Sequence, residues 1–303
     1  MNMSKNEKIT TPKWFKKAIL APYETKSILV NECKINFLVW KNLSDNNCRK
    51  KVLFVHGGGA HAQWWRFIAP LLTEYEVAAL DLSGMGDSGR RTKYSAKERV
   101  LEILYVLEAC DFLKNSYVVG HSFGGYMAIC FAAKYGSQVD GVVIVDSPIF
   151  PPGTASDAKP RRALRIQKFY PSFKIAMERF KLLPPQDCKN TFILEFIAKN
   201  SIKSTERGWT WKFDVSAMGG NRWQEPFEEH IRNTQTKLGL IYGSRSALLS
   251  EDTAQYMTKI LPHNAPITKI HDAAHHVMLD QPQLFVTTLK ETLLKLERLP
   301  LVK

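Results

Sequence analysis

Residues 116–125 read SYVVGHSFGG, a short apolar run that leads into Gly120-His121-Ser122-Phe123-Gly124. The run at 116–121 has the length and composition of a buried strand, and a helix-length segment follows over roughly 124–135. A serine flanked by glycines two residues away, between a strand and a helix, is typical of a nucleophile elbow. The glycines are needed because larger side chains would collide in so sharp a turn. The sequence therefore predicts Ser122 as a nucleophile.

Strand-like runs alternate with helix-length segments on both sides of this turn. Strands are predicted over 34–40, 51–56, 76–82, 116–121, 141–146, 238–243 and 266–271, and helices over 61–73, 95–113, 124–135, 250–260 and 282–298. Such alternation predicts an α/β fold with a doubly wound, mostly parallel sheet. The alternation of strands and helices stops over 147–235, a stretch that is rich in Pro, Lys, Arg and aromatic residues. We expect a mainly helical cap there, inserted into a core formed by residues 1–146 and 236–303.

A glycine run, His56-Gly57-Gly58-Gly59-Ala60, ends the predicted strand 51–56. Glycines allow the backbone to approach a ligand closely. Two backbone N–H groups are needed to hold an oxyanion beside a serine nucleophile, and we assign them to Gly58 and Phe123. Trp64 and Trp65 follow this loop and are predicted to form the floor of the substrate pocket.

The general base is sought after the last strand, where the sequence reads Asp272-Ala273-Ala274-His275-His276. A neutral imidazole there can take the serine proton and return it to the leaving group. His275 fits this position and His276 is the competitor. His263, His271 and His276 are otherwise expected to be surface histidines.

Together, VVGHSFGGYMA, DLSGMGDSG (81–89) and HDAAHHVMLDQP (271–282) resemble segments of the α/β-hydrolase superfamily, most closely its capped soluble bacterial esterases. The resemblance implies the fold and the reaction type but not the substrate. It places the triad acid in a Gly-x-x-Asp pattern, where this chain has Gly243-Ser244-Arg245-Ser246. Some members place the acid after the preceding strand, where Asp146 stands, so Asp146 is our choice. Asp252 and Glu251 are the reserve candidates.

Composition excludes several other classes of protein. The 303 residues carry a net charge of +13, but no basic run reaches five residues and no nucleic-acid motif is present. No apolar run is long enough to span a bilayer and the first residues lack a signal-peptide core, which predicts a cytoplasmic protein. The five cysteines form no C-x-x-C pair, which argues against a zinc site or disulfides; they are Cys33, Cys48, Cys110, Cys130 and Cys188. The oligomeric state stays open.

No metal or organic cofactor is expected. Residues 84–89 form a G-x-G-x-x-G pattern, yet residues 90–93 separate it from any helix, so a dinucleotide site is not predicted. The expected substrate is a small ester with an apolar group, facing aromatic residues of the cap. These are Phe169, Tyr170, Phe173, Phe180, Phe192, Phe196, Trp209, Trp211, Phe213 and Trp223. Alternatives are a thioesterase acting on an acyl carrier, a carbon–carbon bond hydrolase or perhydrolase, and a non-catalytic receptor.

Overall fold

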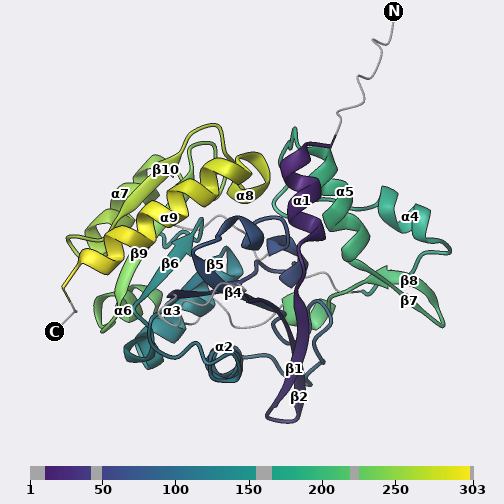
Figure 1. Ribbon diagram of the computed structural model, residues 1–303, viewed down its shortest axis with the longest axis horizontal. Helices are drawn as coiled ribbons and strands as arrows, with labels where there is room; N and C mark the ends of the chain where they lie inside the picture. The colour runs from purple at the N-terminus through teal and green to yellow at the C-terminus, as the bar shows by residue number, and fades with distance from the viewer. Residues whose placement is uncertain (1–10, 42–49, 155–165, 219–224, 301–303) are drawn as a thin grey trace, which may run out of the picture.

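The structure is a computed structural model that describes residues 11–41, 50–154, 166–218 and 225–300. An eight-stranded sheet runs through the centre of these residues (Figure 1). In spatial order its strands are β1 (Glu24–Val30), β2 (Cys33–Trp40), β4 (Tyr75–Leu80), β3 (Lys50–Val55), β5 (Ser116–His121), β6 (Gly141–Val145), β9 (Lys237–Gly243) and β10 (Ile267–Ile270). β2 pairs antiparallel with β1 and β4, and the remaining pairs are parallel. The predicted doubly wound, mostly parallel fold is confirmed.

Each face of the sheet carries its own hydrophobic core, because successive side chains of a strand point to opposite faces. Leu53 and Val55 pack on one side, with α2 (Ala96–Ala109), α3 (Phe123–Tyr135), α6 (Phe227–Arg232) and α7 (Glu251–Ile260). Val52 and Phe54 pack on the other, with α1 (Lys13–Leu20), α8 (Val277–Asp280) and α9 (Pro282–Arg298). Figure 1 shows α1 and α9 above the sheet and α2 and α3 beneath it. Burial on both faces explains why the parallel strands read as continuous apolar runs.

Residues 61–73 differ from the predicted helix. They form two short 3₁₀ helices, η1 (Ala62–Trp65) and η2 (Ala69–Leu71). Pro70 has no N–H to donate within a longer α-helix, and its ring would clash with the preceding turn. The helix α1 and the edge strand β1 were not predicted at all.

The segment between β6 and β9 is only partly helical. It contains α4 (Phe173–Glu178), α5 (Thr191–Asn200), η4 (Val215–Met218) and α6, but also an antiparallel pair, β7 (Ile202–Thr205) and β8 (Gly208–Trp211). The expectation of a mainly helical segment missed this hairpin. Gly208 enters β8 at φ 105°, and a Cβ there would lie 2.5 Å from the Tyr170 carbonyl oxygen. Cys48 and Trp223 lie outside the described residues.

Two helices of this segment pack on different parts of the core. Phe192 on α5 meets Phe15 of α1, with ring centroids 4.9 Å apart. Phe227 on α6 packs instead against Tyr126 of α3, with centroids 4.8 Å apart. Within the described residues, no helix combines the length and apolarity needed to cross a bilayer.

Candidate active site

Ser122 occupies a strained turn between β5 and α3. Its φ of 53° and ψ of −118° are rare for a residue with a side chain, and such strain is typical of functional turns. The flanking glycines make the turn possible, since a Cβ on Gly120 would lie 2.3 Å from the Gly124 carbonyl oxygen. A Cβ on Gly124 would lie 2.3 Å from the Val55 carbonyl oxygen. The turn also holds the backbone in register, because the Ser122 N–H donates to the Val145 carbonyl at 2.9 Å.

His275 joins Ser122 to Asp146 through both of its ring nitrogens. Its Nε2 lies 2.9 Å from Ser122 Oγ, and its Nδ1 lies 2.8 Å from Asp146 Oδ1. An ionised carboxylate can only accept, so Nδ1 carries the proton and Nε2 presents a lone pair to the serine. The Asp146 and His275 side chains are almost fully buried. The structure therefore brings together the three residues that the sequence had assigned to a triad.

Ser246 stands where the resemblance implied a carboxylate, and it contacts Asp146, the acid that the sequence predicts instead. Its hydroxyl donates to Asp146 Oδ1 at 2.6 Å, and the Gly243 N–H donates to Asp146 Oδ2 at 2.9 Å. These bonds fix the carboxylate from the end of β9. The reserve acids lie elsewhere: Glu251 pairs with Lys269 at 3.2 Å, and Asp252 is exposed in the first turn of α7.

The glycine loop after β3 approaches Ser122 closely. A Cβ on Gly57 would lie 3.4 Å from Ser122 Cβ and 3.1 Å from His121 Nδ1. Gly57, Gly58 and Gly59 line the same cavity as Ser122, and Gly59 has a φ of 73°. Within the described residues, neither the Gly58 nor the Phe123 N–H donates to a backbone carbonyl. Both assigned donors are thus available to a ligand.

His56 holds this loop against the loop that follows β4. Its Nδ1 donates to the Gly57 carbonyl at 2.7 Å, and its Nε2 accepts the Leu82 N–H at 3.0 Å. The side chain has no exposed surface, and burial lowers the pKa of His56 from 6.5 to about 4. The neighbouring Asp81 supports the same region by accepting the Ala62 N–H at 2.6 Å. Burial raises the pKa of Asp81 from 3.8 to about 6.

The depressed pKa of His56 makes the stability of the fold pH-dependent. The unfolded chain takes up a proton near pH 6.5, whereas the folded chain does so only near pH 4. This contribution is complete above the unfolded pKa and is lost as the pH falls through the folded pKa. Asp81, whose pKa is raised, acts in the opposite direction in the same window, so we expect the histidine's loss of about 3 kcal/mol as the difference between urea titrations of the native protein and of His56→Gln. The stability of His56→Gln should rise relative to that of the native protein as the pH falls, and a constant difference between the two would contradict the assignment.

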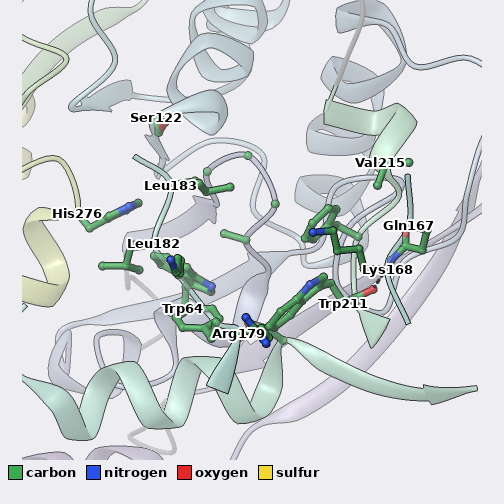
Figure 2. Close-up of a pocket in the computed structure, with 18 of the residues that line it drawn as sticks. Trp64, Ser122, Gln167, Lys168, Arg179, Leu182, Leu183, Trp211, Val215 and His276 are labelled. Carbon is green, nitrogen blue, oxygen red and sulfur yellow. Dashed lines mark hydrogen bonds between the residues drawn. The ribbon is translucent and has the colours of Figure 1, made fainter. Parts of the chain in front are cut away.

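A cavity of about 320 Å³ opens beside Ser122 (Figure 2). Ser122 and His276 lie at one end of it, and Gln167, Lys168 and Trp211 lie at the other. Its walls are mostly apolar and aromatic, with three cationic side chains added. They include Ala60, Trp64, Tyr170, Phe180, Leu182, Leu183, Trp211, Phe213 and Val215, with the cations Lys168, Arg179 and Lys181. No Asp or Glu of the described residues lines it.

Only part of the predicted pocket lining is found at the cavity. Trp64 lines it and lies 5.3 Å from the ring of His276, centroid to centroid. Trp65 does not: it is 1% exposed and stacks on Phe54 in the core, because adjacent residues of η1 point in different directions. Of the ten aromatics expected in the cap, four line the cavity. Phe173 and Trp209 pack against each other, Phe192 and Phe196 pack against Phe15 of α1, and Phe169 lies under the Arg207 guanidinium.

Two buried histidines at the site were not predicted to have a place there. His276 is 4% exposed, which corrects its expected surface position, whereas His263 and His271 are exposed. His121 is 2% exposed and approaches the Ser122 turn from β5. His121, His275 and His276 can be read from the sequence, but their spacing along the chain does not predict that the three rings lie side by side.

Gln186 ties the segment between β6 and β9 to the loop that carries His275. Its Oε1 accepts the His276 N–H at 2.8 Å, and its Nε2 donates to Asp280 Oδ2 at 3.0 Å. Asp280 Oδ2 also accepts the Ala274 N–H at 2.7 Å. Burial raises the pKa of Asp280. The loop that carries His275 and His276 is therefore held by Gln186 from the segment between β6 and β9, and by Asp280 from α8.

Sequence relatives of this chain are named as lipases and esterases. It is 22% identical over 247 residues to Lipase 3 of Moraxella sp., which covers 78% of this chain and 75% of that protein. It is 24% identical over 259 residues to Esterase Rv0045c of Mycobacterium tuberculosis, covering 80% and 82%. The chain is thus similar to bacterial esterases over most of its length.

Solved structures share the same fold. The crystal structure of E-2-(acetamidomethylene)succinate hydrolase superposes with a TM-score of 0.76 at 18% identity, covering 90% of this chain and 99% of that one. The crystal structure of Rv0045c gives 0.70 at 23% identity, covering 90% and 91%. The model of the alpha/beta hydrolase family matches residues 52–288, a range that contains the Ser122 turn, Asp146 and His275. The chain belongs to the alpha/beta hydrolase family.

Proposed function

We propose that this protein is a serine hydrolase that cleaves carboxylic esters through an acyl-enzyme. Ser122 is the nucleophile, His275 the general base and acid, and Asp146 the residue that orients His275. The observation that carries the proposal is the continuous chain of contacts at the end of the cavity, 2.9 Å from Ser122 Oγ to His275 Nε2 and 2.8 Å from Nδ1 to Asp146. Ester hydrolysis at the level of the family agrees with the relatives named lipase and esterase.

The reaction follows from the positions of these groups. Ser122 Oγ attacks the acyl carbon while its proton passes to His275 Nε2, and the carbonyl electrons move onto the oxygen. The N–H groups of Gly58 and Phe123 stabilise that oxyanion. Collapse of the tetrahedral intermediate expels the alcohol, which takes the proton from His275. Water then repeats the sequence on the acyl-enzyme and releases the acid. Asp146 stabilises each transient imidazolium.

The segment 147–235 acts in this proposal as the cap that selects the acyl group. It supplies Phe180, Leu182, Leu183 and Trp211 to the cavity wall. An apolar wall favours an apolar acyl chain. We therefore expect p-nitrophenyl butyrate and octanoate to be hydrolysed with higher kcat/KM than the acetate.

Mass spectrometry of the products separates ester hydrolysis from carbon–carbon cleavage and perhydrolysis, and absence of turnover on all esters would favour a receptor. Cytoplasmic location is a separate prediction, open to fractionation.

A second candidate, a thioesterase acting on an anionic acyl carrier, is favoured by one observation. Lys168, Arg179 and Lys181 line the cavity, and within the described residues none of them pairs with a carboxylate. All three are exposed to solvent, so they suit a phosphate or carboxylate that stays outside while the acyl chain enters. The fold is also that of a solved thioesterase domain from the curacin pathway, with a TM-score of 0.71 at 20% identity.

Charge removal distinguishes these two substrates. Arg179→Gln is expected to raise KM for octanoyl-coenzyme A by about two- to fivefold, because exposed ion pairs contribute up to about 1 kcal/mol. Added salt should have the same effect on the native protein. KM for p-nitrophenyl octanoate should change in neither case. Lys174→Gln is the matched control, since Lys174 is an exposed lysine of α4 that does not line the cavity. Equal effects on both substrates would exclude the carrier.

A further inference from the structure

Three buried histidine rings gather beside the nucleophile, although the proposed reaction uses only one. His121 comes from the end of β5, and His275 and His276 come from the loop between β10 and α8. A ligating nitrogen from each lies within 4.8 Å of the other two. The ring centroids are 4.8 Å apart for His121 and His275, 5.4 Å for His121 and His276, and 4.8 Å for His275 and His276.

The hydrogen bonds leave nitrogen lone pairs in this cluster, one of which faces Ser122 Oγ at 2.9 Å. His121 Nε2 donates its proton to the His275 carbonyl at 3.0 Å, so His121 Nδ1 carries a lone pair. His275 Nε2 carries a lone pair because Nδ1 donates to Asp146. Neither ring nitrogen of His276 has a hydrogen-bond partner among the described residues, although the side chain is buried. Burying such groups without partners costs about 1–3 kcal/mol each, so a missing ligand would explain them.

All three rings are also buried: His121 is 2% exposed, His275 1% and His276 4%. Figure 2 shows His276 at the cavity wall near Ser122, where an ion could enter.

We propose that His121 Nδ1, His275 Nε2 and one ring nitrogen of His276 form a site for a zinc-class divalent transition-metal ion, and that its occupation blocks the hydrolase. Imidazole binds zinc at about 2.0–2.1 Å, so two ligands of a tetrahedral ion lie about 3.3 Å apart. The rings must close in from their present spacing for the three nitrogens to reach one ion. A water molecule or Ser122 Oγ completes the coordination.

Inhibition follows from the lone pair that the ion occupies. His275 Nε2 is the atom that takes the serine proton, so a metal bound there removes the base. Asp146 accepts a hydrogen bond from the His275 Nδ1–H. In the metal-bound state the same bond would orient the imidazole that binds the ion. The inhibitory part of this inference rests on the proposed function, whereas binding of the ion does not.

The test measures binding and inhibition separately on the full chain after treatment with a chelator. Calorimetry with Zn²⁺ should give one equivalent, and Co²⁺ should give the visible bands of a low-coordinate nitrogen site. Zn²⁺ should also inhibit p-nitrophenyl ester hydrolysis, and EDTA should restore it. His276→Leu removes one ligand, and His121→Asn removes another while keeping an N–H for the His275 carbonyl. Each should weaken Zn²⁺ binding and inhibition, relative to its own metal-free rate, by at least about tenfold.

His263→Gln is the matched control, because His263 is exposed and lies outside the cavity. Its Zn²⁺ affinity and inhibition should equal those of the native protein. The proposal is overturned if His276→Leu and His121→Asn bind Zn²⁺ as tightly as the native protein, or if binding disappears when the cysteines are alkylated. Binding of one equivalent that both variants weaken, in a protein that cleaves no ester, would leave the site standing and reject the proposed function. Ester cleavage without Zn²⁺ binding would reject the site alone.

Discussion

Replacing Ser122 by alanine is expected to reduce ester turnover by on the order of 10⁶-fold, to the level left by binding and the oxyanion hole. The substitution removes the attacking oxygen 2.9 Å from His275 Nε2 and leaves the backbone turn in place. The melting temperature should change little, since alanine meets the same strain at φ 53°. Steady-state kinetics on a p-nitrophenyl ester, with a thermal melt of each preparation, checks both expectations. Full activity in the folded variant would rule out Ser122 as nucleophile.

Ser122→Gly is the matched variant that separates strain from chemistry. It should be as inactive as Ser122→Ala, yet more stable, because glycine adopts positive φ without a steric penalty. We expect a gain of about 1 kcal/mol in the free energy of unfolding. A stability equal to that of the alanine variant would mean that the turn stores no such strain.

The second large effect is expected from Asp146→Asn, a loss on the order of 10⁴-fold in kcat at neutral pH. Asparagine keeps the shape and accepts positive φ, which Asp146 adopts at 46°. It can however donate toward His275 Nδ1, which would favour the tautomer with the proton on Nε2, and it carries no charge to stabilise an imidazolium. Circular dichroism should show a folded protein. Asp252→Asn is the control. An equal loss of kcat in that variant would mean that the acid that orients His275 lies in α7.

Ser246 offers two further variants on the same carboxylate. Ser246→Ala removes one hydrogen bond to Asp146 and should cost about tenfold, the value of one bond to a charged group. Combining Ser246→Asp with Asp146→Asn should restore part of the lost rate, because the Ser246 side chain already reaches Asp146 Oδ1 at 2.6 Å. A double variant as inactive as Asp146→Asn would show that β9 cannot carry the acid in this chain.

The parallel strands could be predicted from sequence because they are buried on both faces. β3, β5, β6 and β9 each contain a short apolar run that ends at or just before a glycine, histidine or aspartate, which is typical of strands buried on both faces. β1 escaped prediction because it is an edge strand whose residues are mostly exposed, so its sequence is apolar only over the last three residues. The β7–β8 hairpin escaped because two short strands of four residues resemble the surrounding aromatic loop.

The residues of the proposed triad could be located from sequence because a chemical role restricts each one to a strand end. Ser122 needs its glycines, and a base and an acid must follow later strands that bring them to the same edge. The cavity could not be predicted in the same way. Trp64 and Trp65 are adjacent and alike, and only the short 3₁₀ helix decides that one lines the cavity and the other fills the core. The environment of His276 depends on Gln186 and on packing between segments far apart in the chain.

Labelling with a fluorophosphonate, followed by peptide mapping, tests the proposed mechanism most directly. The reagent reacts only with a serine whose proton a nearby base removes, so labelling reports the nucleophile and its activation together. We predict one adduct per chain, located on Ser122, absent from Ser122→Ala and formed far more slowly in Asp146→Asn. Adducts on Ser147 or Ser246, or no adduct in a folded protein that cleaves esters, would contradict an acyl-enzyme on Ser122.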